Sequence, residues 1–541
     1  MKKFLLALLL FSCLALAYSP HPKEVGASKV FIELNWTIDF GDKLPPEFTF
    51  TSFAYPTNAW QNARFESAGE HSFVQETDSF GNVLAKFSFQ PKKKVEVVSL
   101  RALVDVNYAA SSTQQTATNY SEQTSLTAVS PEIISKAQQL SAGKSDLEKA
   151  VALAEWVHNH VRYDGPGYGA TVQSAASTFA SAVGTCDEYS HLFSSMARAS
   201  GLSTKFVAGF VCSTECEKSG NWGAHAWNEV LIDGKWVPFD TTFNEGVLLD
   251  ATHVKFAEGR DQNDIKEKLS AIAFDFSIKD VQVTRSTVVS LDDWQPFQKF
   301  FSVSVSVPSK TFGKEAIVPV EVILSSNTNQ ELALPININV PKEARVTPLA
   351  DALVLLQPST TASRNWNVLL PESLDAGFIY NFTVQAISLG TPAQASITAT
   401  AQGESQKSFS IKISDVLPTI AEGSLSLKIV LENSGNEPAD AAISITTNIG
   451  NASQTVSVPA ASKKEAFFSF PSSPNTTLVE GSIFVKTSSL EITQPISISL
   501  ERPAQPTAFL PDVSSISSPL PLAAAAIVII LFLALYLLKQ H

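Results

Sequence analysis

The amino-acid sequence predicts a multidomain protein in which one α+β domain is flanked by β-sandwich domains and followed by a single C-terminal transmembrane helix. Helical periodicity with helix-capping residues occurs in residues 128–260. The segments before and after it alternate apolar and polar residues, as in KVFIELNWTIDF and SLKIVLEN, which indicates half-buried β-strands. Residues 520–538 are apolar and uncharged, which is typical of a membrane-spanning helix.

The composition narrows the classes of function. The chain has 541 residues, of which 44% are hydrophobic and 17% are charged, so it is long enough for several domains and too apolar to be mostly disordered. The formal net charge is −13 and no basic block occurs, which argues against a nucleic-acid binder. Its 4 cysteines are too few for a disulfide-dense or multi-zinc scaffold. No phosphate-binding loop, dinucleotide fingerprint or serine-nucleophile elbow occurs, and we expect no cofactor and no metal.

Both ends of the chain carry membrane-directed signals. The first residues combine two lysines, an apolar run and a small-residue ending, so residues 1–17 are predicted to be a secretory signal peptide; lipid attachment at Cys13 is the alternative. Lys539 directly follows the predicted helix at 520–538. We therefore expect a single-pass protein of the cell membrane, with its bulk extracellular, as in prokaryotic surface proteins. A sorting tail that is removed during anchoring is the alternative.

Changes in sequence pattern divide the segment between the predicted signal peptide and the predicted transmembrane helix into domains and linkers. The predicted bounds are a β-rich domain at 18–108, a linker at 109–127, the α+β domain at 128–260, a connector at 261–297, immunoglobulin-like sandwiches at 298–400 and 405–500, and a Pro/Ser-rich stalk at 501–519.

The helices of the α+β domain have clear start signals. Ser130-Pro131 places a proline at the first helical position. Ser145 with Glu148, and Thr185 with Glu188, are capping boxes, in which each side chain satisfies a free backbone N–H at the start of a helix. The second capping box makes Cys186 the first residue of its helix. The helix dipole and the free N–H groups there favour a thiolate, so we expect a lowered pKa and a reactive cysteine. A buried structural cysteine is the alternative.

A predicted hairpin brings a histidine and an aspartate together. Asp233-Gly234 lies between two alternating runs, as in a two-residue hairpin turn. If Ile232 pairs with Lys235, His225 and Asp240 are diagonal neighbours on one face of the sheet. The carboxylate then orients the imidazole and leaves its other nitrogen for the thiol. A register slip of one residue would put the two side chains on opposite faces.

The same residues carry a resemblance to a known family. The matching motifs are Trp156-Val157, Val161-Arg162-Tyr163-Asp164, Gly184-Thr185-Cys186-Asp187-Glu188-Tyr189, Ala197-Arg198-Ala199-Ser200-Gly201-Leu202, His225-Ala226-Trp227-Asn228-Glu229-Val230 and Trp236-Val237-Pro238-Phe239-Asp240. Over residues 128–245 the chain resembles the transglutaminase-like superfamily, which has a papain-like core. The resemblance implies that Cys186 is the nucleophile, His225 the general base and acid, and Asp240 its orienter, with a protein or peptide as substrate. It implies acyl transfer through a cysteine thioester, resolved by water in a protease or amidase and by a lysine amine in a cross-linking enzyme.

Two questions stay open at this level. Cys212 and Cys216 are separated by three residues in an exported segment, so we expect a disulfide, with a metal pair or free thiols as alternatives. The alternative to an enzyme is a surface adhesion or structural protein that uses the transglutaminase-like domain only for binding.

Overall fold

The computed structural model describes residues 21–108, 120–164, 172–216, 219–272, 276–347, 351–405, 408–421, 423–473 and 476–500. The chain divides into two compact units, Met1–Glu501 and Arg502–His541, and the described residues belong to the first. The predicted signal peptide, stalk and transmembrane helix lie outside them. None of the helices in the described ranges is long and apolar enough to cross a membrane.

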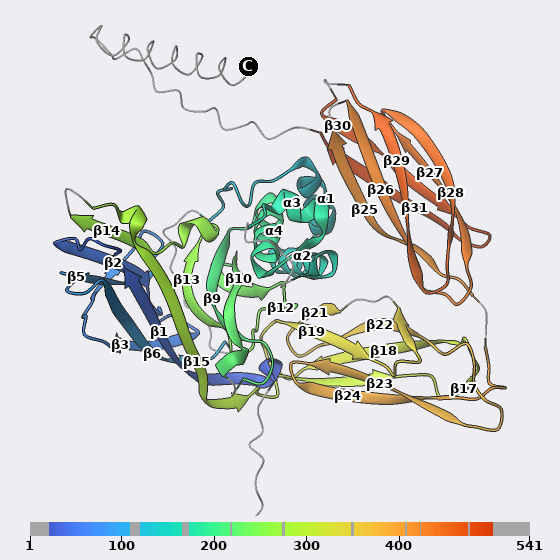
Figure 1. The fold of residues 1–541 in the computed structure, drawn as a ribbon. Helices are drawn as coiled ribbons and strands as arrows, with labels where there is room; N and C mark the ends of the chain where they lie inside the picture. Colours follow the sequence, from blue (N-terminus) through green and yellow to red (C-terminus); the bar gives the residue numbers. More distant parts are fainter. Residues whose placement is uncertain are drawn as a thin grey trace, which may run out of the picture. The chain divides into compact units, whose positions relative to one another are not determined.

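The N-terminal part consists of two antiparallel sheets, which contain a segment from much later in the chain (Figure 1). One sheet has the order β15 (Gln282–Pro296), β1 (Val25–Asp39), β6 (Val95–Val106) and β3 (Gln61–Ser67). The other has the order β14 (Lys268–Ile272), β2 (Glu47–Phe53), β5 (Val83–Phe89) and β4 (Val74–Thr77). Alternate residues of β1 are fully buried, as period-2 alternation predicts: Val30, Ile32, Leu34, Trp36 and Ile38.

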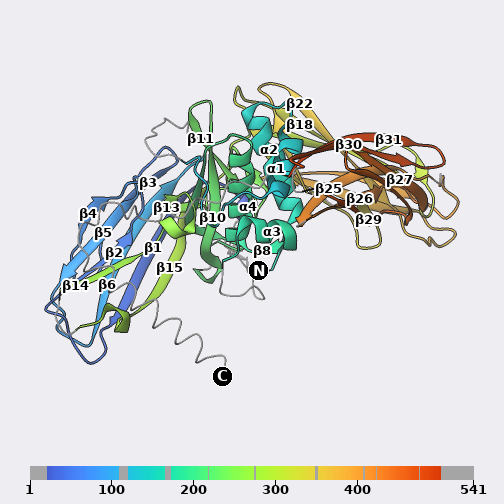
Figure 2. The same ribbon diagram turned by 90° about the horizontal axis from the view of Figure 1, so that it is seen from above.

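The prediction of a connector at 261–297 is wrong, because this segment contains two strands of these sheets. β15 pairs with β1 from Pro296 opposite Val25 to Gln282 opposite Asp39, and β14 pairs with β2. Seen from above, β14 and β15 run with the strands of the N-terminal part (Figure 2). Both are edge strands, and most residues of β15 are exposed, so its sequence lacks the apolar alternation from which a strand is recognised.

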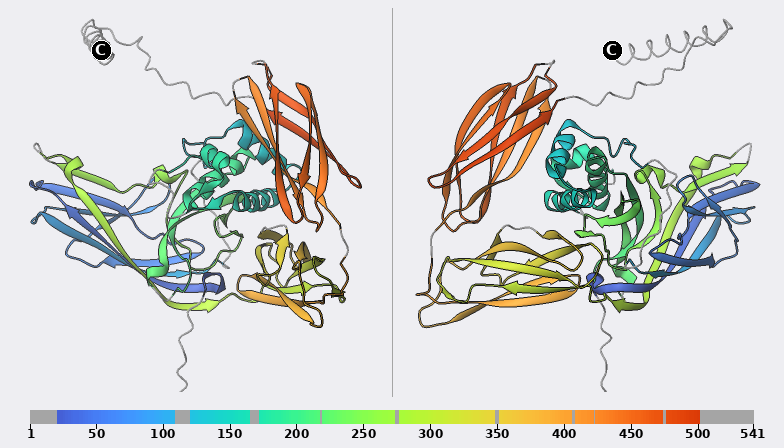
Figure 3. Two further views of the ribbon diagram at one scale, coloured as in Figure 1. Left: turned by 45° about the vertical axis from the view of Figure 1, so that its right-hand side comes forward. Right: turned by 180° about the vertical axis from the view of Figure 1, so that it is seen from behind.

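In the α+β domain, helix α4 packs against one sheet, and the other three helices pack on α4 (Figure 3). The helices are α1 (Pro131–Ser141), α2 (Asp146–His160), α3 (Ala175–Ser181) and α4 (Cys186–Ala199). The sheet is antiparallel, with the order β12 (Glu245–Gly246), β11 (Lys235–Asp240), β10 (Trp222–Ile232), β9 (Thr204–Cys212) and β13 (Val254–Gly259). A two-strand parallel ladder joins β7 (Arg162–Tyr163) to β8 (Val183–Gly184). Short 3-10 helices lie at Pro22–Glu24, Ser219–Asn221, Gln262–Asp264 and Ile278–Asp280.

The helix starts and the hairpin register follow the sequence. Ser130 and Ser145 accept the predicted capping hydrogen bonds at the starts of α1 and α2. Ile232 lies opposite Lys235, and the register continues to Asn228 opposite Phe239. Both turn residues have positive φ, 49° at Asp233 and 73° at Gly234, as a hairpin turn of this length requires.

The C-terminal described part is entirely β. Two sheets have the orders β16 (Phe301–Ser306), β18 (Ile317–Ser326), β22 (Thr361–Leu369), β20 (Arg345–Thr347), and β17 (Thr311–Phe312), β24 (Thr391–Ala399), β23 (Tyr380–Ser388), β19 (Leu332–Asn339), β21 (Ala352–Leu356). Two more have the orders β25 (Ile411–Ala421), β26 (Ser424–Asn433), β29 (Ser462–Pro471), and β28 (Gly450–Val458), β27 (Ala439–Thr447), β30 (Leu478–Lys486), β31 (Glu491–Ser499). In the last pair, apolar side chains from both sheets form one core, as in a β-sandwich.

Candidate active site

Glu188 fixes the start of α4 and with it the position of Cys186. Its Oε2 atom accepts hydrogen bonds from the backbone N–H and the hydroxyl of Thr185, both at 2.8 Å. Its Oε1 atom accepts from the backbone N–H of Gln173 at 2.9 Å. Gly184 leaves room for this carboxylate, because a Cβ at that position would lie 2.4 Å from the Glu188 Cβ. The predicted capping box therefore makes Cys186 the first residue of α4.

The thiol of Cys186 lies between its own helix and strand β10. The sulfur is 3.5 Å from Asp187 Oδ1 and accepts a hydrogen bond from the backbone N–H of Ala226, the neighbour of His225. Burial, followed by the charge of Asp187, raises the pKa of the Cys186 thiol. The expectation of a lowered pKa is therefore wrong for this state, because lost solvation and a neighbouring carboxylate outweigh the helix terminus. The thiol is protonated and requires a base.

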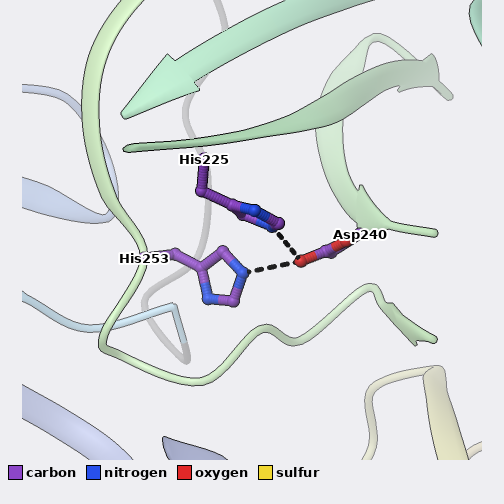
Figure 4. Close-up of side chains that lie close together, drawn as sticks. All are labelled: His225, Asp240 and His253. Atoms are coloured by element: carbon purple, nitrogen blue, oxygen red, sulfur yellow. Dashed lines mark hydrogen bonds and ion pairs between the residues drawn. The ribbon is translucent and has the colours of Figure 1, made fainter. Parts of the chain in front are cut away.

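His225 is held by Asp240 across the hairpin. Its Nε2 atom is 2.7 Å from Asp240 Oδ2, and both side chains are buried (Figure 4). The ring of Phe243 stacks on the imidazole with centroids 5.0 Å apart. Because the carboxylate accepts at Nε2, the proton of the neutral ring lies there and Nδ1 keeps its free electron pair.

Asp240 accepts hydrogen bonds from four groups. His225 and His253 contact Oδ2, and the backbone N–H groups of Thr242 and Phe243 donate to Oδ1 at 2.7 and 3.1 Å. Burial opposes ionisation, but the neighbouring His225 and His253 and their hydrogen bonds hold the pKa of Asp240 well below its usual range. Asp240 is therefore a carboxylate that only accepts.

The sequence analysis missed His253. This residue directly precedes β13, is fully buried, and places Nε2 at 3.0 Å from Asp240 Oδ2 (Figure 4). No motif or strand pairing links it to Asp240 in the sequence. The only available signal is a histidine beside a strand of the predicted catalytic domain.

The histidines and carboxylates around Asp240 are candidate metal ligands. Two overlapping groups among the described residues bring ligand atoms within 4.8 Å of one another: His225, Asp240 and His253, and Glu245, Asp250 and His253. In the first group both imidazole Nε2 atoms already contact one carboxylate oxygen. Hydrogen bonding accounts for this closeness without an ion, and we assign no metal.

A cavity of about 370 Å³ opens beside His225. Its lining includes Asp187, the neighbour of Cys186, and four phenylalanines, and consists further of aliphatic, polar and charged residues: Phe53, Phe206, Phe210, Phe256, Ala208, Gly209, Ala224, Ala226, Gln262, Ile265, Glu267 and Arg285. A larger cavity of about 570 Å³ is lined by residues such as Trp60 and Trp236 and includes none of the three predicted catalytic residues. The smaller cavity is thus the one that a substrate of this site would enter.

The other two cysteines of this domain form a disulfide. Cys212 ends β9, and its sulfur is bonded to that of Cys216. The carbonyl of Cys216 accepts a hydrogen bond from the Trp222 indole at 2.8 Å, at the start of β10. Cys186 is the free cysteine among the described residues.

The structure places a thiol at the start of α4, an imidazole on the adjoining strand β10, and a carboxylate in contact with that imidazole. Residues 134–241 match the family model of the transglutaminase-like superfamily. The predicted resemblance is confirmed: this segment is a transglutaminase-like core.

Curated relatives match over the same part of the chain. The kyphoscoliosis peptidase of Mus musculus is 32% identical over 124 residues, which are 22% of this chain and 18% of the peptidase. The Homo sapiens kyphoscoliosis peptidase is 31% identical over 127 residues, with the same coverage of 22% and 18%. The chain thus spans about a fifth of the length of these relatives.

Two solved structures match this chain with low TM-scores. A candidate cysteine protease from Cytophaga hutchinsonii has 18% identity and a TM-score of 0.37, covering 50% of this chain and 94% of its own. Red sea bream transglutaminase has 9% identity and a TM-score of 0.16, covering 90% and 94%.

Proposed function

We propose that this protein is a cysteine enzyme that transfers acyl groups from amides through a thioester on Cys186. The observation that carries the proposal is the ordered chain of contacts at the site. Asp240 holds Nε2 of His225 at 2.7 Å, and the next residue of the same strand, Ala226, donates its N–H to the Cys186 sulfur. We propose that Nδ1 of His225, the nitrogen that does not contact Asp240, faces the thiol.

The proposed reaction begins with a neutral pair. As the Cys186 sulfur attacks the amide carbon, its proton passes to His225 Nδ1 and the carbonyl electron pair moves to oxygen. The free N–H groups at the start of α4, that of Cys186 included, stabilise the oxyanion. The C–N bond then breaks, the nitrogen takes the proton from Nδ1, and an amine or ammonia leaves. Water, losing a proton to Nδ1, attacks the thioester carbon; the C–S bond then breaks, the carboxylic acid leaves, and the sulfur takes the proton from Nδ1 to regenerate the thiol.

We propose hydrolysis as the main outcome, with a protein or peptide as substrate. The curated relatives that match this domain are named peptidases. Cross-linking of glutamine to lysine differs only in the group that attacks the thioester, because a lysine amine then takes the place of water.

We further propose that the enzyme is extracellular and anchored in the cell membrane. The sequence at residues 1–17 and 520–538 supports this location. The Cys212–Cys216 disulfide supports it independently, because disulfides persist in oxidising compartments.

The raised pKa of the Cys186 thiol favours the second candidate, a surface protein that uses this domain only for binding. The two candidates differ in one experiment. The full chain is incubated with a peptide library, and new amino termini and released ammonia are measured by mass spectrometry. An enzyme generates products that are lost in Cys186→Ala and unaffected in Asp293→Asn, an exposed control on β15. A binding protein gives no products with either chain.

A further inference from the structure

His253 occupies a position that requires a positive charge. Its Nε2 atom lies 3.0 Å from Asp240 Oδ2, and its Nδ1 atom lies 3.1 Å from the backbone carbonyl oxygen of Asp250 and 3.4 Å from Asp250 Oδ1. A carbonyl and a carboxylate only accept hydrogen bonds. A neutral imidazole has one N–H and satisfies one side, whereas the imidazolium satisfies both.

The groups that face His253 support this protonation state. Asp250 and Asp240 are the two anions, and Glu245 beside Asp250 is an acid whose pKa burial raises to about 8. The remaining titratable neighbours are His225, with ring centroids 5.7 Å away, and Tyr108, whose hydroxyl donates to the His253 carbonyl at 3.1 Å. Lys23 acts on Glu245 from farther away. Burial works against the cation, yet Asp250 and Asp240 raise the pKa of His253 well above its usual value.

The positive charge of His253 reduces the stabilisation that Asp240 gives to a second proton on His225. Both imidazoles contact the same carboxylate oxygen, so the charge of His253 offsets part of the negative charge that would stabilise a second proton on His225. Two imidazolium rings at 5.7 Å would also repel each other. The charge of Asp240 also acts on the Cys186 thiol, where it is one of the causes that raise the pKa.

We propose that His253 is a positioning residue: as a buried imidazolium between Asp250 and Asp240, it fixes the shared carboxylate and keeps the Cys186–His225 pair uncharged at rest. The site then contains a chain of four side chains in which Asp250 holds His253, His253 holds Asp240, and Asp240 holds His225. The proposal rests on the proposed pairing of Cys186 with His225. It does not depend on whether the substrate is hydrolysed or cross-linked.

The test is the pH dependence of Cys186 alkylation by iodoacetamide, followed by mass spectrometry of the Cys186 peptide. His253→Gln keeps an N–H for Asp240 and removes the charge. His225 then gains basicity and the thiolate–imidazolium pair becomes more favourable. We expect the alkylation profile to move by about one pH unit to lower pH, which is about tenfold faster reaction at pH 6. The matched control is His160→Gln, a half-buried histidine whose ring stacks on Trp156, and it should follow the native profile.

A profile for His253→Gln that coincides with the native profile overturns the proposal. So does a stoichiometric metal that is present in the native chain and absent in the variant. Because alkylation needs no substrate, a chain without hydrolytic activity can still show the shift, and the two proposals fail separately.

A second measurement covers the case in which His253→Gln does not fold. Nitrogen NMR of the native chain, labelled in its imidazole rings, should show one histidine with both nitrogens protonated at pH 7, where an unperturbed histidine is mostly neutral. A neutral tautomer of His253 at pH 7 contradicts the proposal.

Discussion

The sheet that carries the candidate site and the C-terminal sandwich at 411–499 bury very different side chains. In the first, six ionisable side chains of β10, β11 and the segment that follows are at most 5% exposed: Glu229, Asp240, Glu245, Asp250, His253 and Lys255. Among the described residues of the sandwich, Glu432 is the buried ionisable group, and exposed lysines face it. Buried charge is costly and persists only where every group has a partner, so its concentration marks the part of the molecule built around chemistry.

Not all of this buried charge belongs to the site. Lys255 Nζ lies 2.8 Å from Glu229 Oε1 and also contacts Glu258, which Lys205 reaches at 2.8 Å. Despite burial, these lysines lower the pKa of Glu258 to about 2. This network pairs two lysines with two glutamates and joins β9, β10 and β13. The His253–Asp240–His225 cluster differs from it, because it leaves one nitrogen, Nδ1 of His225, free to take a proton.

The largest expected effect is that of Asp240→Asn. The amide has one acceptor oxygen, so the variant cannot accept both from the two imidazoles and from the backbone N–H groups of Thr242 and Phe243, and His225 loses the anion that fixes its tautomer. We expect a loss of about 10³- to 10⁴-fold in kcat/KM for amide hydrolysis. Asp440→Asn, an exposed position on β27 of the sandwich, is the matched control and should leave kcat/KM unchanged. Equal activity of the native chain and Asp240→Asn would contradict the assignment of Asp240.

Lys255→Met should destabilise the fold by about 3–5 kcal/mol, because it leaves Glu229 and Glu258 buried with one lysine between them. Urea unfolding measures this change in the free energy of unfolding. A loss below about 1 kcal/mol would mean that water solvates the charges of this network. The network would then differ little in energy from the exposed ion pairs of the sandwich.

Glu245→Gln should change how stability depends on pH. Burial and Asp250 raise the pKa of Glu245 to about 8, above its ordinary value near 4.5, so the folded state holds a proton that the unfolded state releases. This stabilisation is complete below about pH 4.5 and is lost as pH rises through about 8. The variant has no such proton, so its stability should fall less over that interval, by up to about 5 kcal/mol. Parallel curves of unfolding free energy against pH for the two chains would refute the raised pKa.

The smallest effect is expected in the sandwich. Lys428 and Glu465 form an ion pair at 3.2 Å with both side chains partly exposed. Lys428→Ala should therefore change the free energy of unfolding by less than about 1 kcal/mol. A loss as large as that of Lys255→Met would remove the difference between the two regions.

Local signals in the sequence predict the part of the site that depends on local structure. The Thr185–Glu188 capping box predicts where α4 begins, and Asp233-Gly234 predicts the register that brings His225 to Asp240. Those signals act over a few residues, where backbone hydrogen bonds and turn geometry decide the outcome.

The features that depend on distant packing were not predictable in the same way. β15 is recognised only through its pairing with β1, more than two hundred positions earlier. His253 directly precedes β13, at one edge of the sheet, and contacts Asp240 of β11, which lies near the other edge. No short motif encodes this topology. The raised pKa of the Cys186 thiol reflects burial, which the position at a helix start does not reveal.

The central claim is that Cys186 forms a thioester with an amide substrate. The most direct measurement is rapid acid quenching of the full chain with a peptide library, followed by mass spectrometry of the Cys186 peptide. We expect an acyl adduct on Cys186 that hydroxylamine removes and that is absent in His225→Gln. Products that form without any adduct, or at the same rate in Cys186→Ala, would contradict it.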